Sequence, residues 1–151
     1  MSPHEPYDEA TIVSLWTEIF QTQLALDYYP SPDSIVYAPV EGHAINEEIC
    51  KKLKLSSAVV SLMKHLPYPR DFDIAHDFPI FEGSVAIPYT QEDQILFARD
   101  PDNDFAVNDE EEIRRDFLLP SEIALVVSIG EGLHLILDTA ASIWLRHPNY
   151  E

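Results

Sequence analysis

Apolar residues recur every three or four positions in the first part of the chain, which is the spacing of one face of a helix. Asp8 precedes this pattern and is a suitable N-cap, and Pro30 and Pro32 follow it. The pattern predicts an amphipathic core helix that runs to about Tyr28, preceded by a loose arm over residues 1–7. The apolar positions of its core face are Ile12, Leu15, Trp16, Ile19, Phe20 and Leu24.

Shorter elements are expected between residues 34 and 66. Residues 34–37 predict a short strand, and an aligned set of Ile and Leu predicts a second helix over Asn46–Leu53. A third helix is expected over Ala58–Leu66, where Ser56 or Ser57 can cap its start. Lysines near the C-terminal ends of both helices stabilise them, because a positive charge there interacts favourably with the helix dipole.

The stretch between residues 67 and 120 is rich in proline and acidic residues, and its pattern is less regular. The expected segments are strands at 78–81 and 85–89, helices or loops at 91–98 and 110–117, and an exposed loop at 100–109. We find no internal repeat and no long linker. Residues 1–151 therefore fit a single domain, long enough to bury a core.

The last third of the chain predicts a three-stranded antiparallel meander. Apolar runs at 124–129, 133–139 and 142–146 are separated by short breaks. The first break is Gly130-Glu131-Gly132, a hairpin signal because glycine supplies the positive φ of a tight reversal. The expected fold class is therefore α+β, with N-terminal helices packed on a C-terminal antiparallel sheet.

Simple alternation gives this meander two faces. The expected buried face holds Leu125, Val127, Leu135 and Leu137, and the opposite face holds Val126, Ile136 and Trp144 beside His134. The opposite face is more apolar than a solvated face needs to be, so a helix, a loop or another molecule should cover it. If no part of the chain covers it, we expect Trp144 to anchor a protein partner or a second copy there.

The charge of the chain narrows its possible partners. The 27 acidic and 9 basic residues give a formal net charge of −18, which repels phosphate backbones and anionic lipids. We therefore expect neither nucleic-acid nor membrane binding. A basic protein partner, a cationic ligand or plain solubility are the alternatives that remain.

The expected compartment is the cytoplasm, with the nucleus as a possibility. Cys50 is the single cysteine and cannot form an intramolecular disulfide, which suits a reducing compartment. The N-terminal residues have neither the basic start nor the apolar core of a signal peptide. No apolar run approaches the roughly 20 residues that span a bilayer.

One acidic segment, residues 100–111, partly matches a calcium-binding loop. Asp100, Asp102 and Asp104 occupy positions one, three and five, and Glu111 occupies position twelve. Position six should be glycine for the sharp turn, and it is Phe105 here. We therefore expect no calcium site, no metal and no cofactor.

Three residues are weak candidates for catalysis. His76 and Asp77 are adjacent in an acidic segment, 71–77, that we expect to be a polar loop, and they could form an acid–base pair. His134 lies on the second face of the meander without an evident nucleophile nearby. For Cys50, the neighbouring lysines could favour a thiolate, whereas an apolar neighbourhood favours an inert buried thiol.

Several tyrosines lie near prolines, among them Tyr68 and Tyr89. Tyrosine and proline together often line grooves that bind peptides, because the ring offers contact area at a low cost in entropy. The alternative is that these rings simply anchor loops.

Three short motifs, Leu66-Pro67-Tyr68, Arg99-Asp100-Pro101 and Ile136-Leu137-Asp138-Thr139, resemble segments that recur in a group of uncharacterised fungal proteins. The run over residues 118–139 also resembles, more remotely, the strand–Gly turn–strand–Asp pattern of the SUKH-type module. That module occurs in fungal cell-wall regulators and bacterial toxin-immunity proteins. The resemblance covers the last third of the chain and implies an α+β domain that binds proteins, with no catalytic residue carried over.

These observations favour an acidic intracellular module that binds a protein, with a basic protein or a second copy of itself as the candidate partners, without catalysing a reaction. The alternative is a small cofactor-free enzyme that acts on a metabolite in a pocket lined by Tyr and His. A deep pocket that holds His76 or His134 beside an acidic group would favour the enzyme.

Overall fold

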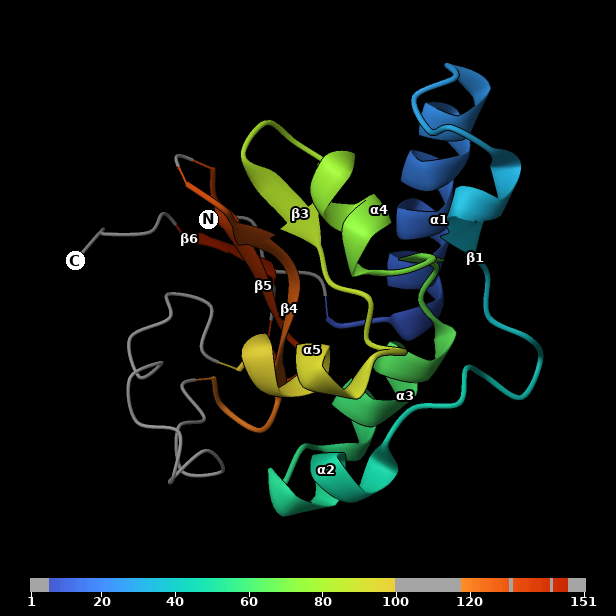
Figure 1. Ribbon diagram of the computed structural model, residues 1–151. Coiled ribbons are helices and arrows are strands. Elements are labelled where there is room, and N and C mark those ends of the chain that lie inside the picture. The colour runs from blue at the N-terminus through green and yellow to red at the C-terminus, as the bar shows by residue number, and fades with distance from the viewer. Residues whose placement is uncertain (1–5, 100–117, 131, 142, 147–151) are drawn as a thin grey trace.

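The computed structural model describes residues 6–99, 118–130, 132–141 and 143–146. It has an α+β fold, in which helices lie beside an antiparallel sheet (Figure 1). The helices are α1 Glu9–Ala25, α2 Glu47–Lys52, α3 Ser57–His65, α4 Phe72–Asp77 and α5 Glu92–Phe97. The strands are β1 Ile35–Val36, β2 Tyr68–Pro69, β3 Ser84–Ala86, β4 Glu122–Ser128, β5 His134–Asp138 and β6 Ile143–Arg146. The predicted acidic loop at 100–111 and the segment 110–117 lie outside the described residues.

The first helix forms where the apolar spacing predicts it. Helix α1 begins directly after Asp8, whose carboxylate accepts a hydrogen bond from the Thr11 hydroxyl. Trp16 and Phe20 are buried and meet edge to face, with ring centroids 6.1 Å apart. Leu15, which the pattern places on the core face, is 52% exposed, because the apolar stripe is wider than the core that it covers.

Side-chain caps fix the starts of three short helices. The Asn46 side chain accepts the Ile49 N–H at 3.2 Å in α2, and Ser56 Oγ accepts the Val59 N–H at 3.3 Å in α3. Both helices are confirmed to within a residue of their predicted starts. Asp71 caps α4 in the same way, so the prediction of a polar loop over residues 71–77 is wrong.

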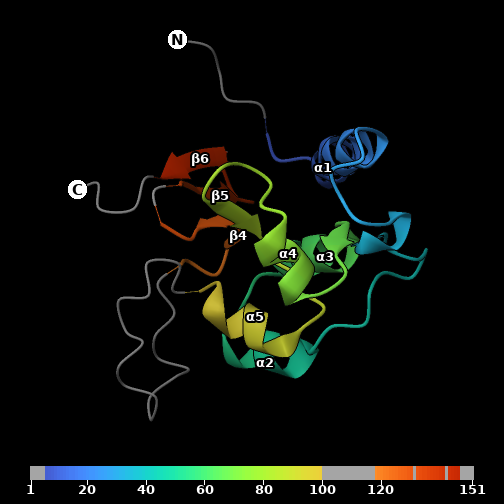
Figure 2. The same cartoon turned by 45° about the horizontal axis from the view of Figure 1, so that its top comes forward.

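The main sheet is four-stranded in the described residues, with the order β3-β4-β5-β6 and antiparallel pairing throughout. It confirms the predicted C-terminal meander and adds β3 at one edge (Figure 2). Strands β1 and β2 form a separate pair. Residues 78–81 do not form the predicted strand, and only an isolated bridge joins Phe81 to Ser84.

A β-bulge changes which residues share a face of this sheet. Ala124 pairs with Ile136, but the next paired residues are Val126 and Leu135, so Leu125 is an extra residue in β4. Directly paired residues lie on the same face, and Val126 therefore shares a face with Leu135. The prediction that Val126 and Ile136 share a face is wrong, because strict alternation does not allow for a bulge.

Two of the three residues predicted to form a docking surface on the sheet are buried. Val126 and Ile136 are both 0% exposed, so they are core residues and cannot contact a partner in this fold. Leu135, expected in the core, is only partly buried. The side chain of Trp144 lies outside the described part of the structure, and its role as an anchor stays a prediction.

Candidate functional site

The two histidines proposed from the sequence lie in different settings. His76 is exposed on α4, where its ring packs on Phe72 with centroids 5.5 Å apart, and Asp77 beside it is also exposed. His134 is buried in β5, and its Nδ1 accepts the Ser128 N–H at 2.9 Å. The bond to Ser128 gives His134 a structural role in the hairpin between β4 and β5.

Tyr68 and Tyr89 are core residues, not groove residues. Their rings lie 6.0 Å apart, and their hydroxyls donate to the backbone carbonyls of Met63 and Ala124 respectively. Burial raises the pKa of both phenols well above the usual range. The prediction that these tyrosines bind a peptide is wrong, since both rings are at most 2% exposed.

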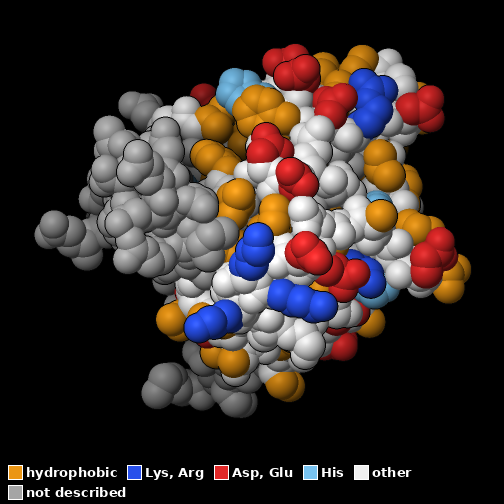
Figure 3. All heavy atoms as spheres, turned by 60° about the horizontal axis from the view of Figure 1, so that its bottom comes forward, with side chains coloured by type: hydrophobic (Ala, Val, Ile, Leu, Met, Phe, Trp, Pro, Cys, Tyr) orange, Lys and Arg blue, Asp and Glu red, His pale blue; other side chains and the backbone are white. Residues whose placement is uncertain are grey.

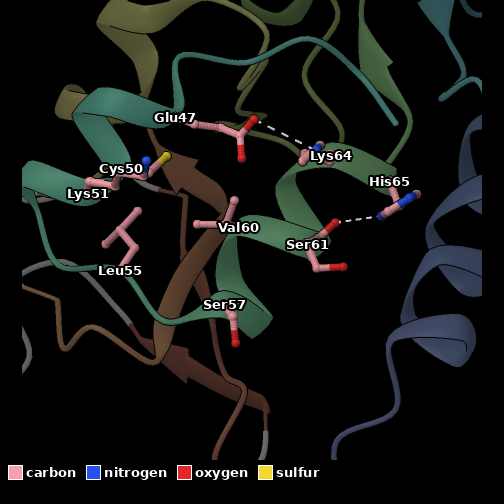
Figure 4. Close-up of a pocket in the computed structure, with 9 residues that line it drawn as sticks. All are labelled: Glu47, Cys50, Lys51, Leu55, Ser57, Val60, Ser61, Lys64 and His65. Carbon is pink, nitrogen blue, oxygen red and sulfur yellow. Dashed lines mark hydrogen bonds and ion pairs between the residues drawn. The ribbon is translucent and has the colours of Figure 1, made fainter. Parts of the chain in front are cut away.

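The structure has a groove at a different place from the one predicted around the tyrosines. It lies between α2 and α3 and has a volume of about 420 Å³ (Figure 4). A short turn joins the two helices, in which Lys54 has φ +58° and the Leu55 N–H donates to the Cys50 carbonyl at 3.0 Å. The lining residues are Glu47, Cys50, Lys51, Leu55, Ser57, Val60, Ser61, Lys64 and His65. Neither histidine proposed from the sequence is among them.

Helical spacing explains how the two walls of the groove are built. The α3 wall consists of positions one turn apart, namely Ser57, Val60, Ser61 and Lys64, and the α2 wall consists of Glu47, Cys50 and Lys51. The opposite side of α3, with Val59, Leu62 and Met63, is buried in the core. Helix α3 therefore uses one face for the fold and presents the other to the groove.

Basic side chains concentrate around this groove. All four lysines of the chain lie between residues 51 and 64. Two of them, Lys51 and Lys64, line the groove, and Lys64 Nζ lies 3.8 Å from a carboxylate oxygen of Glu47. Figure 3 shows basic side chains gathered near the middle of the face that α2 and α3 form, with apolar and acidic side chains among them. An exposed pair such as Lys64–Glu47 is weak, so Lys64 can exchange it for another anion.

Cys50 forms part of the apolar floor. It is 2% exposed, and burial, followed by the nearby Glu47 carboxylate, raises the pKa of its thiol. The idea that neighbouring lysines favour a thiolate is wrong, because desolvation has the larger effect. Cys50 is therefore an inert thiol, as the alternative interpretation of the sequence held.

His65 closes the groove at the end of α3. Its Nδ1 lies 2.8 Å from the Ser61 carbonyl oxygen, one turn earlier, and 3.8 Å from a carboxylate oxygen of Glu9 in α1. These contacts hold the ring between α1 and α3.

His43 contacts the end of α3 through its backbone and its ring. Its backbone N–H donates to the Lys64 carbonyl at 2.7 Å, its ring Nε2 lies 2.7 Å from the Leu66 carbonyl oxygen, and the ring packs on Tyr68. Burial lowers the pKa of His43. The imidazole therefore takes up a proton less readily in the folded chain than in the unfolded chain.

This low pKa predicts a pH dependence of stability. The unfolded chain protonates His43 below about pH 6.5, whereas the folded chain does so only at a lower pH. The free energy of unfolding should therefore fall as the pH drops from about 6.5, and His43→Gln should remove that part of the decrease. Urea denaturation at several pH values measures it, with the exposed His76→Gln as the control. Equal pH slopes for the wild type and His43→Gln would contradict the prediction.

One sequence signal for this groove is present, namely the concentration of all four lysines in one short segment of a strongly acidic chain. Taken singly, those lysines indicate favourable charges at helix ends or charged neighbours of Cys50, and they do not predict a groove. The remaining information, that two helices leave adjacent faces uncovered, comes from tertiary packing.

In the part of the chain that the structure describes, no three His, Cys, Asp or Glu side chains gather closely enough to hold a metal ion. Within those same ranges, no helix combines the length and the apolar character needed to cross a bilayer. Comparisons with models of known protein families, with curated proteins and with solved structures find no match.

Proposed function

We propose that the chain is a non-catalytic, intracellular protein-binding module, and that its binding surface is the groove between α2 and α3. The observation that carries this proposal is the pair of facing helix stripes, which surround an apolar floor with cationic groups. The floor residues Leu55 and Val60 are partly buried, so a partner side chain can complete their burial. The single buried cysteine suits a reducing compartment.

Two further observations support binding over catalysis. His76 is exposed on a helix surface, His134 is buried with a backbone partner, and neither lines the groove between α2 and α3. The similarity of residues 118–139 to the SUKH-type module points the same way, since such modules bind proteins. The proposed binding surface therefore lies on the helices and not on the sheet, where Val126 and Ile136 are buried.

Site-specific photocrosslinking in the source cell tests the proposal. A photoreactive amino acid at Ser57, an exposed groove residue, should give a discrete adduct with a partner protein. The same amino acid at the exposed Glu82 is the control, since the turn before β3 lies at the opposite end of the molecule from α2 (Figure 1). A second change, Val60→Glu, should abolish the Ser57 adduct because it puts a carboxylate on the apolar floor.

Thermal denaturation checks that the Val60→Glu chain is folded, and Val60→Ala serves as a milder variant if it is not. No adduct at Ser57, equal adducts at Ser57 and Glu82, or an adduct that persists in a folded Val60→Glu chain would each overturn the proposal.

A further inference from the structure

We infer that the occupant of the α2–α3 groove is an acidic amphipathic helix of a partner protein. Its aliphatic side chains enter the groove, and its carboxylates meet Lys51 and Lys64. The inference rests on the proposed function and specifies the chemistry of the partner. It also differs from the expectation of a basic partner, which follows from the net charge of the chain alone.

The charge distribution supports an acidic partner. Residues 46–65 contain four lysines and two glutamates, a net charge of +2, which leaves −20 for the rest of the chain. The groove lining itself places Lys51 and Lys64 against one carboxylate, Glu47, so an acidic segment meets favourable charges there. A basic segment would be attracted elsewhere and repelled by Lys51 and Lys64.

The apolar floor supports an amphipathic partner. Cys50, Leu55 and Val60 provide apolar surface between the two helices, as Figure 4 shows. Because a purely charged segment would leave that surface against water, the partner should carry aliphatic side chains on one side and carboxylates on the other.

The geometry of the walls favours a helix over an extended strand. Strand addition needs a sheet edge with unpaired backbone groups, whereas both walls of this groove are helices and neither is a sheet edge. Side chains at one-turn spacing on α2 and α3 match an apolar stripe at positions i, i+3, i+4 and i+7 of a third helix. A volume of about 420 Å³ suits a few inserted side chains.

Two synthetic peptides test the inference with the full chain. Both are about 15 residues long, near the length at which an isolated helix can form. Both carry Leu at i, i+3, i+4 and i+7, and one has Glu at most other positions whereas the other has Lys. Fluorescence anisotropy should show saturable binding of the Glu peptide that weakens as salt is added, and no groove-dependent binding of the Lys peptide.

Charge reversal locates the interaction. The double variant Lys51→Glu, Lys64→Glu should bind the Glu peptide about tenfold more weakly or worse, and should bind the Lys peptide better than the wild type does. The double variant Lys52→Glu, Lys54→Glu is the matched control, since it changes the net charge equally at two nearby lysines that do not line the groove. A loss with this control as large as with Lys51→Glu, Lys64→Glu would mean that only the general field matters, and would overturn the inference.

The outcomes separate this inference from the proposed function. If the Ser57 crosslinker captures a partner but the Glu peptide does not bind, the acidic helix is wrong and the binding module stands. If Ser57 captures nothing, the proposed function fails whatever the peptides do. Sedimentation that shows a dimer disrupted by both Val60→Glu and Lys51→Glu would identify a second copy as the occupant and overturn the inference.

Discussion

Replacing Arg99 by methionine is expected to lower the free energy of unfolding by about 3–5 kcal/mol, because buried acceptors lose their donors. Arg99 is 2% exposed and directly follows the last turn of α5. Its guanidinium donates to the carbonyl oxygens of Glu122, Leu118 and Leu119 at 2.6, 2.9 and 2.7 Å. Methionine has a similar length and no donor, so these carbonyls would lose the charged partner that replaces water.

Urea denaturation of matched variants measures this effect. Arg99→Lys should recover only part of the loss, because an ammonium group cannot reproduce the fork of a guanidinium. The control is Arg70→Met, since Arg70 is exposed and pairs with its neighbour Asp71 at 3.4 Å. That change should cost no more than about 1 kcal/mol. Similar losses for Arg99→Met and Arg70→Met would show that the guanidinium contacts contribute little.

Arg99 belongs to one of the three short motifs that resemble segments of fungal proteins, and each motif contributes a structural contact. In the first motif, the buried Tyr68 hydroxyl donates to the Met63 carbonyl, and in the second, Arg99 joins the end of α5 to the segment that enters β4. In the third, the Thr139 hydroxyl donates to the Ser121 carbonyl at 2.8 Å. All three are structural contacts, so sharing these motifs would indicate a shared fold before a shared function.

Local patterns predicted those elements whose cause is local. The start of α1 follows from the apolar spacing, since the Asp8 side chain accepts no backbone N–H of the helix, whereas the caps Asn46 and Ser56 follow from hydrogen bonds within a few residues. The strands on either side of Gly130 follow from their apolar runs. Asp71 was an equally clear cap for α4, and it was missed because its acidic neighbours suggested a loop.

Features that depend on pairing between distant residues could not be predicted in this way. The bulge at Leu125 depends on how β4 meets β5, and no residue type in β4 marks it. Because the bulge shifts the alternation by one residue, the sequence interpretation placed Val126 on the wrong face. The groove has the same origin, since it depends on which faces of α2 and α3 the core leaves uncovered.

Gly132→Ala is expected to destabilise the sheet by about 3 kcal/mol or more, because its new methyl group would overlap backbone atoms. A Cβ at Gly132 would lie 2.1 Å from the Gly83 carbonyl oxygen and 2.3 Å from Ser84 Oγ. This overlap disturbs a junction between β3 and the hairpin, where Ser84 Oγ accepts the Leu133 N–H at 2.9 Å and donates to the Leu133 carbonyl. The Ile129 N–H also donates to the Gly83 carbonyl at 2.8 Å.

The neighbouring glycine distinguishes this overlap from the general cost of a side chain in the turn. A Cβ at Gly130 would meet no atom within 4 Å, although its φ of +156° disfavours alanine, so Gly130→Ala should cost only about 1 kcal/mol. Thermal denaturation of the two variants measures the difference, and amide exchange at Ile129 and Leu133 shows whether the junction has opened. Equal losses of stability for the two variants would mean that Gly132 serves only the turn. A larger loss at Gly132 would establish it as the position where β3 and the hairpin between β4 and β5 must approach most closely.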